Sequence, residues 1–183
     1  MDFLELAKKR CSVRSYLEKQ VEQEKIEKIL EAGRVAPTAA NKQPQKILVI
    51  KSEEGLEKLA KASHVFGAPL FFVICADHSQ TWKRANDGMD SADIDASIVT
   101  THMMLQATEL GLDSIWICSF KPDILRAEFD MPKDVVPINL LGVGYAAGAV
   151  KSPDRHMAQR KPLAETVFYE TFIVAEKLPE EPQ

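Results

Sequence analysis

The chain has 183 residues, which is enough for one domain and short for two. Apolar residues make up 45% of it, so material for a hydrophobic core is present and a wholly disordered chain is excluded. The 23 basic and 27 acidic side chains leave a net charge of −4. Without a basic excess, nucleic acid is not an expected partner.

The cysteine content and the apolar runs indicate the cellular compartment of the protein. Three cysteines, Cys11, Cys75 and Cys118, are too few and too scattered for a disulfide framework, and an odd number leaves a free thiol. The longest apolar run, residues 69–76, is far shorter than the ~20 residues that a membrane helix needs. The first residues lack the basic start and apolar centre of a signal peptide. We therefore expect a cytoplasmic protein without a membrane partner.

The spacing of apolar side chains predicts five helices. Asp2 can cap the first helix, Pro37 stops the second and Gly111 ends the fourth. The predicted ranges are 2–10, 22–36, 53–63, 91–111 and 122–129.

The fourth helix is the longest and is apolar on several sides, so we expect it to be central. One stripe along it is formed by Ile94, Ile98, Thr101, Leu105 and Thr108. This stripe is widened by Val99, Met103 and Met104.

Short apolar runs between the helices predict strands at 46–51, 70–76, 114–118, 139–146 and 166–174. Helices mixed with short strands favour one α+β domain around a single sheet. We assign this domain to residues 1–176 and expect residues 177–183 to form a frayed tail.

The segment Arg10-Cys11-Ser12-Val13-Arg14 places two arginines around a hydroxyl. If the segment is extended, Arg10, Ser12 and Arg14 point the same way. Guanidinium groups present a rigid fork to phosphate oxygens, so this arrangement suits an anion site. The alternative is a solvated basic corner at a helix C-terminus, which the helix dipole favours.

A polar loop between Pro37 and Pro44 follows the second predicted helix. Its amide and hydroxyl side chains, which can donate and accept hydrogen bonds, are Thr38, Asn41 and Gln43. Such a loop can read the edge of a planar heterocycle. The alternative is an ordinary turn whose side chains satisfy local backbone groups.

Three further cations, Arg155, Arg160 and Lys161, follow the strand predicted at 139–146. They can converge on the same phosphate as the first arginines. The alternative is a solvated charged segment near the C-terminus.

The run from Gly142 to Ala147 fits a dinucleotide-binding fingerprint, with Glu165 some twenty residues later. Its context differs, because Gly148 and Pro153 interrupt any following helix and no parallel strand precedes Glu165. We interpret Gly142 and Gly144 as places where backbones approach closely in a central strand. A dehydrogenase built on this run is kept as a rival hypothesis. The spacing of the histidines and cysteines predicts no metal site.

Taken together, these segments resemble the nitroreductase family of FMN-dependent oxidoreductases over about residues 2–170. The run 10–14 resembles the family's R-x-S-x-R/K motif, and 36–44 resembles its A-P-S/T-x-x-N-x-Q-P loop. Residues 95–117 resemble its central helix and the following strand. Gln45 departs from the pattern, since relatives often carry Trp there.

The resemblance implies an α+β fold with a central mixed, mainly antiparallel sheet flanked by helices, in an intertwined homodimer with FMN at the interface. FMN would be bound by Arg10, Cys11, Ser12 and Arg14 of one subunit, and by Thr38, Asn41 and Gln43 of the partner. The backbone of Ile117, Cys118 and Ser119 would lie near the isoalloxazine ring. Arg160 and Lys161 would reach the phosphate.

The function implied is passage of hydride from NADH or NADPH through FMN to an oxidised acceptor such as a nitroaromatic or quinone, by ping-pong exchange. No side chain needs to act as a base, and Arg14 would stabilise negative charge on the reduced flavin. The loop 77–90 matches no motif and is expected to be a substrate-side lid. Two alternatives remain: a flavin-binding sensor or carrier without turnover, and a related flavoenzyme such as a reductive dehalogenase.

Overall fold

The structure is a computed structural model that describes residues 1–172. The chain divides into two compact units, residues 1–151 and 152–183, each of which is described by itself. The predicted domain boundary after residue 176 and the predicted tail at 177–183 lie outside the described residues, so both stay predictions.

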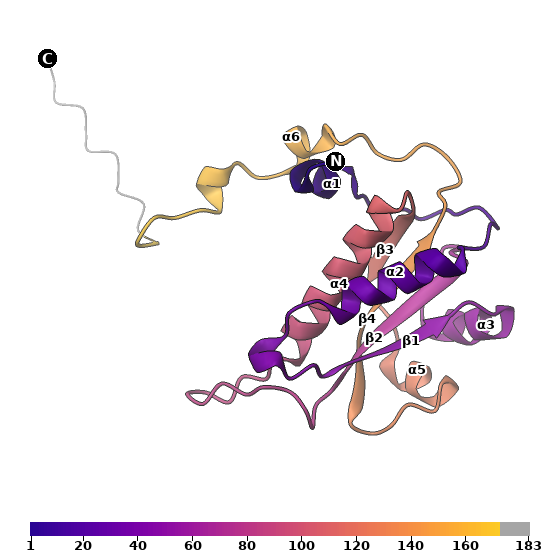
Figure 1. The fold of residues 1–183 in the computed structure, drawn as a ribbon, viewed down its shortest axis with the longest axis horizontal. Coiled ribbons are helices and arrows are strands. Elements are labelled where there is room, and N and C mark those ends of the chain that lie inside the picture. The colour runs from indigo at the N-terminus through magenta and orange to yellow at the C-terminus, as the bar shows by residue number, and fades with distance from the viewer. Residues whose placement is uncertain (173–183) are drawn as a thin grey trace, which may run out of the picture. The chain divides into compact units, whose positions relative to one another are not determined.

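The first unit is built on one four-stranded sheet (Figure 1). Its strands are β1 (Gln45–Ile50), β2 (Leu70–Asp77), β3 (Asp113–Ile117) and β4 (Val135–Gly144). They lie in the order β1-β2-β4-β3, and every neighbouring pair is antiparallel. The predicted α+β fold with a mainly antiparallel sheet is confirmed. Parallel pairing is limited, in the described residues, to a single bridge between Ser12 and Ser114.

Helices cover both faces of this sheet (Figure 1). One face carries α2 (Gln23–Arg34) and α4 (Ala92–Glu109), and the other carries α3 (Glu53–Ala62) and α5 (Pro122–Glu128). The side chains of β2 are all buried and alternate between two apolar clusters. This pattern explains why β2 is a continuous apolar run, since a strand covered on both faces needs no polar side.

The first helix, α1 (Phe3–Lys9), begins as predicted. The Asp2 carboxylate accepts a hydrogen bond from the Glu5 amide at 2.8 Å, and the Asp2 amide donates to the Glu5 carboxylate at 3.2 Å. This reciprocal pair is a capping box, which satisfies two amide groups that have no partner within the helix.

Strand β4 begins four residues earlier than predicted, at Val135. Pro137 concealed this start because proline lacks an amide hydrogen for the ladder. The structure accommodates Pro137 beside an irregularity in the register between Ile74 and Cys75 of β2. Prolines within sheets are placed at such irregularities.

Helix α4 is central, as predicted, but the predicted stripe only partly matches the face that it buries. The side chains that pack between α4 and the sheet include Ala96, Val99, Met103 and Ala107. Thr108 of the stripe and Val99 and Met103, which widen it, are buried. In contrast, Ile98, Thr101 and Leu105 are half-buried, and Ile94 is 50% exposed. The helix therefore has a second apolar side, directed away from the sheet.

The second unit contains α6 (Arg155–Gln159), which was not predicted, and a 3-10 turn at Leu163–Glu165. The strand predicted at 166–174 is wrong over residues 166–172, which form turns and bends. Glu170 has a φ of 62°, which interrupts any extended backbone there. Residues 173–174 lie outside the described residues.

Candidate functional site

The segment that carries the first arginines runs beside the edge strand β3. The Val13 amide donates a hydrogen bond to the Ser114 carbonyl at 3.0 Å. Cys11 and Val13 are buried in the core, whereas Ser12 and Arg14 are exposed and Arg10 is half-buried. The predicted alternation along this segment is confirmed. The Cys11 side chain is turned into the core, so only its backbone is placed to contact a ligand.

A depression of about 320 Å³ opens beside this segment, between residues 11–15 and 146–151. Its lining includes the cations Arg14 and Lys151 and the hydroxyls of Ser12 and Ser15. Cations and hydroxyl donors around one hollow match the requirements of a phosphate group. Lys151 was missed from the sequence because a single lysine in a loop carries no pattern.

A second depression, of about 490 Å³, lies between the end of α3 and residues 117–121. Arg14 connects the two hollows, because its guanidinium carbon lies 6.0 Å from the ring centre of Phe66, which lines the second. The His64 and Phe66 rings lie 4.2 Å apart, and His64 Nδ1 accepts a hydrogen bond from the Phe66 amide. This aromatic wall suits a flat ligand.

The predicted flavin-facing segment borders the second depression. Ile117 is buried, while Cys118 and Ser119 are exposed. Trp116 Nε1 donates a hydrogen bond to the Cys118 sulfur at 3.2 Å, and the Ser63 hydroxyl donates to the Ser119 carbonyl at 3.2 Å. The structure thus brings the segments 10–14 and 117–119 to one side of the sheet, where Arg14 faces the Phe66 ring.

The second polar loop has an unusual backbone. Ala40, Asn41 and Gln43 have φ angles of 49°, 52° and 51°. Asparagine tolerates this region, but alanine and glutamine lose roughly 1–2 kcal/mol each in it. The Gln43 amide donates to the Thr38 hydroxyl at 3.0 Å, and the Gln43 side chain donates to the Asn41 carbonyl at 3.3 Å.

This loop lies at the opposite end of the sheet from Arg14. Ser114, which pairs with Ser12, is level with Leu70 through Val143, whereas Gln45 just after the loop pairs with Ala76. Leu70 and Ala76 are six residues apart along β2, which is roughly 20 Å. The two segments also flank opposite edge strands, β3 and β1. One protomer therefore holds the segment 10–14 and the loop 38–43 apart, and we refer to them as the first and second half-sites of the candidate site.

Comparison with known proteins decides the family. The model of the family described as "Nitroreductase family" matches residues 7–66 and 61–145. The chain belongs to the nitroreductase family.

Relatives of this nitroreductase-family chain are similar to it in sequence or structure over most of its length. A Methanothermobacter thermautotrophicus protein, provisionally named NADH dehydrogenase/NAD(P)H nitroreductase, is 30% identical over 80% of the chain and 78% of its own length. A nitroreductase family protein of Clostridium difficile 630 is 53% identical, with a TM-score of 0.92 over 93% of this chain and 99% of that one. A provisionally named nitroreductase of Exiguobacterium sibiricum, solved with FMN, is 25% identical, with a TM-score of 0.79 over 93% and 98%.

Close packing around two glycines of β4 explains why this nitroreductase-family chain has glycines at the positions that fit a dinucleotide-binding fingerprint. A Cβ atom on Gly142 would lie 2.8 Å from Phe71, and one on Gly144 would lie 2.7 Å from Pro69. The interpretation as close-approach glycines is confirmed. The dehydrogenase hypothesis is wrong, because the described residues after Gly144 form no helix until α6 and the four strands are antiparallel.

The other predicted parts of the site are Arg160 with Lys161 and the loop 77–90. Arg160 and Lys161 belong to the second unit, in which Arg160 Nε contacts His156 Nδ1 at 3.4 Å. Their role at a phosphate stays a prediction. The loop 77–90 is turn-rich and is closed by a bridge between Lys83 and Asp90, and its role as a lid is also a prediction.

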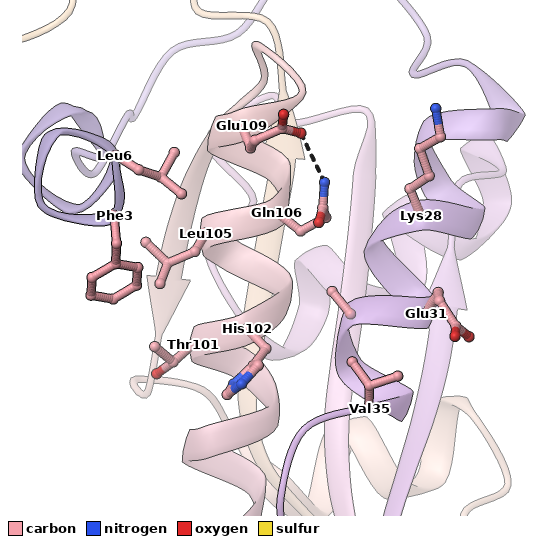
Figure 2. Close-up of a pocket in the computed structure, with 11 residues that line it drawn as sticks. Phe3, Leu6, Lys28, Glu31, Val35, Thr101, His102, Leu105, Gln106 and Glu109 are labelled. Atoms are coloured by element: carbon pink, nitrogen blue, oxygen red, sulfur yellow. Dashed lines mark hydrogen bonds between the residues drawn. The ribbon is translucent and has the colours of Figure 1, made fainter. Parts of the chain in front are cut away.

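Another depression contains none of the predicted site residues. It holds about 690 Å³ between α1, α2 and α4. Figure 2 shows Leu105 of α4 pointing toward Leu6 and Phe3 of α1, with Val35, just after α2, on the other side of His102. A further hollow of about 640 Å³ continues along α4 past Ile94. The outer side of α4 is therefore an apolar surface.

Within residues 1–172, no three His, Cys, Asp or Glu side chains are grouped so that they could hold a metal ion. None of the helices in this part of the chain combines the length and apolar character needed to cross a bilayer.

Proposed function

We propose that this protein is an FMN-dependent oxidoreductase that passes hydride from NADH or NADPH to an oxidised acceptor, such as a nitroaromatic or a quinone, by ping-pong exchange. One observation carries the proposal: Arg14 joins a hollow lined by cations and hydroxyls to a hollow lined by aromatic and backbone groups. An FMN molecule has the matching halves, a phosphate and a flat ring. The FMN complex of a relative 25% identical supports the same assignment.

Different residues of the first half-site would bind different parts of FMN. Ser12 and Arg14 would hold the phosphate end or the adjoining polar chain, and Lys151 would add a second cation. Bound FMN supplies the chemistry, since it accepts hydride and passes two electrons on. Arg14 favours the reduced cofactor because a fixed cation stabilises the negative charge that develops on reduction. Ile117, Cys118 and Ser119 would border the ring through their backbone.

A homodimer would complete the site. The loop 38–43 lies roughly 20 Å from Ser12 along the sheet, so a tricyclic ring cannot contact both within one protomer. The outer apolar side of α4 supports a second copy as the partner, because large exposed apolar patches mark association surfaces (Figure 2). Ile94, Val35 and Phe3 are its most exposed apolar residues.

The first experiment tests the cofactor. Purified protein is mixed with FMN and desalted, and its absorption spectrum is recorded. Retained flavin bands, with FMN released on denaturation, are the expected result. Arg14→Ala should raise the dissociation constant for FMN at least tenfold, the effect of about 1.4 kcal/mol or more from a charge-assisted contact. Arg34→Ala, which removes an exposed arginine from α2, is the matched control and should leave binding unchanged.

The second experiment separates an enzyme from a flavin carrier. NADH or NADPH is added to the FMN-loaded protein without oxygen, and the flavin absorbance is followed. Rapid bleaching, followed by recovery when a quinone or nitroaromatic is added, supports turnover. A flavin that neither nucleotide bleaches would favour the sensor or carrier, and recovery only with a halogenated acceptor would favour the dehalogenase.

A further inference from the structure

We propose that Asp95 is the positioning residue that holds the loop 38–43 in its flavin-contacting conformation. The proposal rests on the proposed function, since that function assigns the loop to the flavin. Asp95 lies in the first turn of α4 and is only 1% exposed. A carboxylate so deeply buried needs partners that compensate for the loss of water.

Both carboxylate oxygens of Asp95 have such a partner. Oδ1 accepts a hydrogen bond from the Ala39 amide at 2.8 Å, and Oδ2 accepts one from the Ser91 hydroxyl at 2.8 Å. The first bond spans 56 residues and connects α4 to the start of the loop. Asp95 therefore acts on a backbone amide at the point where the loop leaves Thr38.

The loop needs this restraint because its backbone is strained. Three residues without a glycine's freedom, Ala40, Asn41 and Gln43, have positive φ angles within a stretch of four. Residues in such regions keep their conformation only where the surroundings impose it, and they are concentrated at ligand sites. The bonds within the loop join Thr38, Asn41 and Gln43 to each other. The Asp95 bond fixes the loop to the rigid fold.

Asp95 does not touch the exposed side of the loop, where a flavin would lie. The Asn41 and Gln43 side chains are exposed, whereas Asp95 lies beneath Ala39. Its effect on the cofactor must therefore pass through the loop. Loss of the bond should relax the loop and weaken FMN binding without removing any group that touches FMN.

The test compares three variants by FMN titration. Asp95→Ala should raise the dissociation constant for FMN roughly 10- to 100-fold, the range of a charge-assisted hydrogen bond. Asp95→Asn keeps an oxygen for the Ala39 amide and should restore affinity to within about threefold of wild type. Glu54→Ala is the matched control, because it removes an exposed carboxylate from the first turn of another helix, α3, and should leave affinity unchanged. Equal losses in Glu54→Ala and Asp95→Ala, or none in Asp95→Ala, would overturn the proposal.

A second measurement needs neither FMN nor a variant of Asp95. Hydrogen exchange of the wild-type Ala39 amide should be slowed at least tenfold relative to an unstructured peptide, and Ser91→Ala should accelerate exchange across residues 39–43. Unprotected exchange at Ala39 would contradict the proposal even if Asp95→Ala fails to fold. If the wild-type protein binds no FMN but Ala39 is protected, the proposed function fails and the link from Asp95 to the loop stands.

Discussion

Arg14 occupies the position on which the candidate site depends, because it lines one hollow and faces the aromatic wall of the next. Its neighbours fix its direction. Val13 and Tyr16 are buried on either side, and the Tyr16 hydroxyl donates a hydrogen bond to the Val13 carbonyl at 3.1 Å. Burial raises the pKa of Tyr16 above its ordinary value, so this hydroxyl keeps its proton and its bond over the whole physiological range.

The three thiols should differ in reactivity. Cys11 and Cys75 are buried, and burial raises the pKa of the Cys75 thiol to about 12, whereas Cys118 is exposed. Since the thiolate is the reactive form, one thiol per chain should react rapidly with a disulfide reagent at pH 8. Cys118→Ser should abolish this phase, and saturating FMN should slow it in the wild-type protein. Rapid reaction of two thiols in the folded protein would contradict this assignment.

Gly142 should tolerate no side chain. An added Cβ would lie 2.8 Å from the Phe71 ring and 3.0 Å from Ile115, inside a fully packed core. Gly142→Ala should lower the free energy of unfolding by about 1–3 kcal/mol, measured by urea denaturation. Gly33→Ala is the comparison: its new Cβ would lie 3.0 Å from Cγ and Sδ of the flexible Met103 side chain, and alanine favours the helix by about 1 kcal/mol. Equal losses in the two variants would show that the Phe71 contact is not the cause.

At the scale of elements, the start of α2 is tied to the end of β4 by one cluster. The Tyr145 hydroxyl donates to the Glu22 carboxylate at 2.6 Å and accepts from Lys25 at 2.9 Å. Lys19 lies 4.0 Å above the Tyr145 ring. These contacts hold the start of α2 at the end of the sheet where the segment 15–17 forms backbone hydrogen bonds with residues 145–147.

This cluster should make stability depend on pH. The Tyr145 hydrogen bond, with the nearby lysines, lowers the pKa of Glu22 from 4.5 to about 2. A carboxylate with a lowered pKa stabilises the fold above its unfolded pKa, and this contribution is lost as the pH falls from about 4.5 toward 2. The difference in Tm between wild type and Glu22→Gln should therefore shrink between pH 6 and pH 3. Tyr145→Phe should reduce this pH dependence, and a difference that stays constant with pH would contradict the assignment.

Elements with a clear pattern were predictable, and the exceptions have physical reasons. The helices 2–10 and 53–63 and the strand 70–76 agree closely with α1, α3 and β2, because caps and dense apolar runs define them. The buried face of α4 was predicted only in part, at Val99, Met103 and Thr108, since periodicity cannot select one side of a helix that is apolar on several. The strand at 166–172 failed because a local pattern cannot reveal whether a pairing partner exists.

The sequence indicated the segments of the candidate site that form motifs. It did not indicate the residues elsewhere in the chain that contact those segments. Arg14 and Asn41 belong to recognisable runs of residues. Lys151, Phe66 and Asp95 contribute through contacts between segments 50 or more residues apart, and no local pattern records such contacts. The resemblance implied that the two half-sites come from different subunits, and the strand register adds how far apart they lie in one protomer.

For the whole molecule, the outer side of α4 makes a prediction about association. Wild-type protein should have a mass in solution near twice the 20.4 kDa of one chain, measured by light scattering. Ile94→Arg places a charge on the apolar surface and should shift the protein to a monomer with weakened FMN binding. Leu17→Arg changes a residue of similar exposure, 49% against 50%, away from this surface and should leave the dimer intact. A monomeric wild type that holds FMN would contradict the shared site.

The most direct test of a site shared between two protomers is complementation. Two chains, each defective in one half-site, are co-expressed with different tags, and the mixed dimer is isolated. One chain carries Arg14→Ala, and the other carries both Asn41→Ala and Gln43→Ala. Each parent dimer should bind FMN weakly at both sites. The mixed dimer should bind half the wild-type amount of FMN at wild-type affinity, because one of its two sites contains neither substitution. A mixed dimer as defective as its parents would show that both half-sites act within one chain and would contradict the proposal.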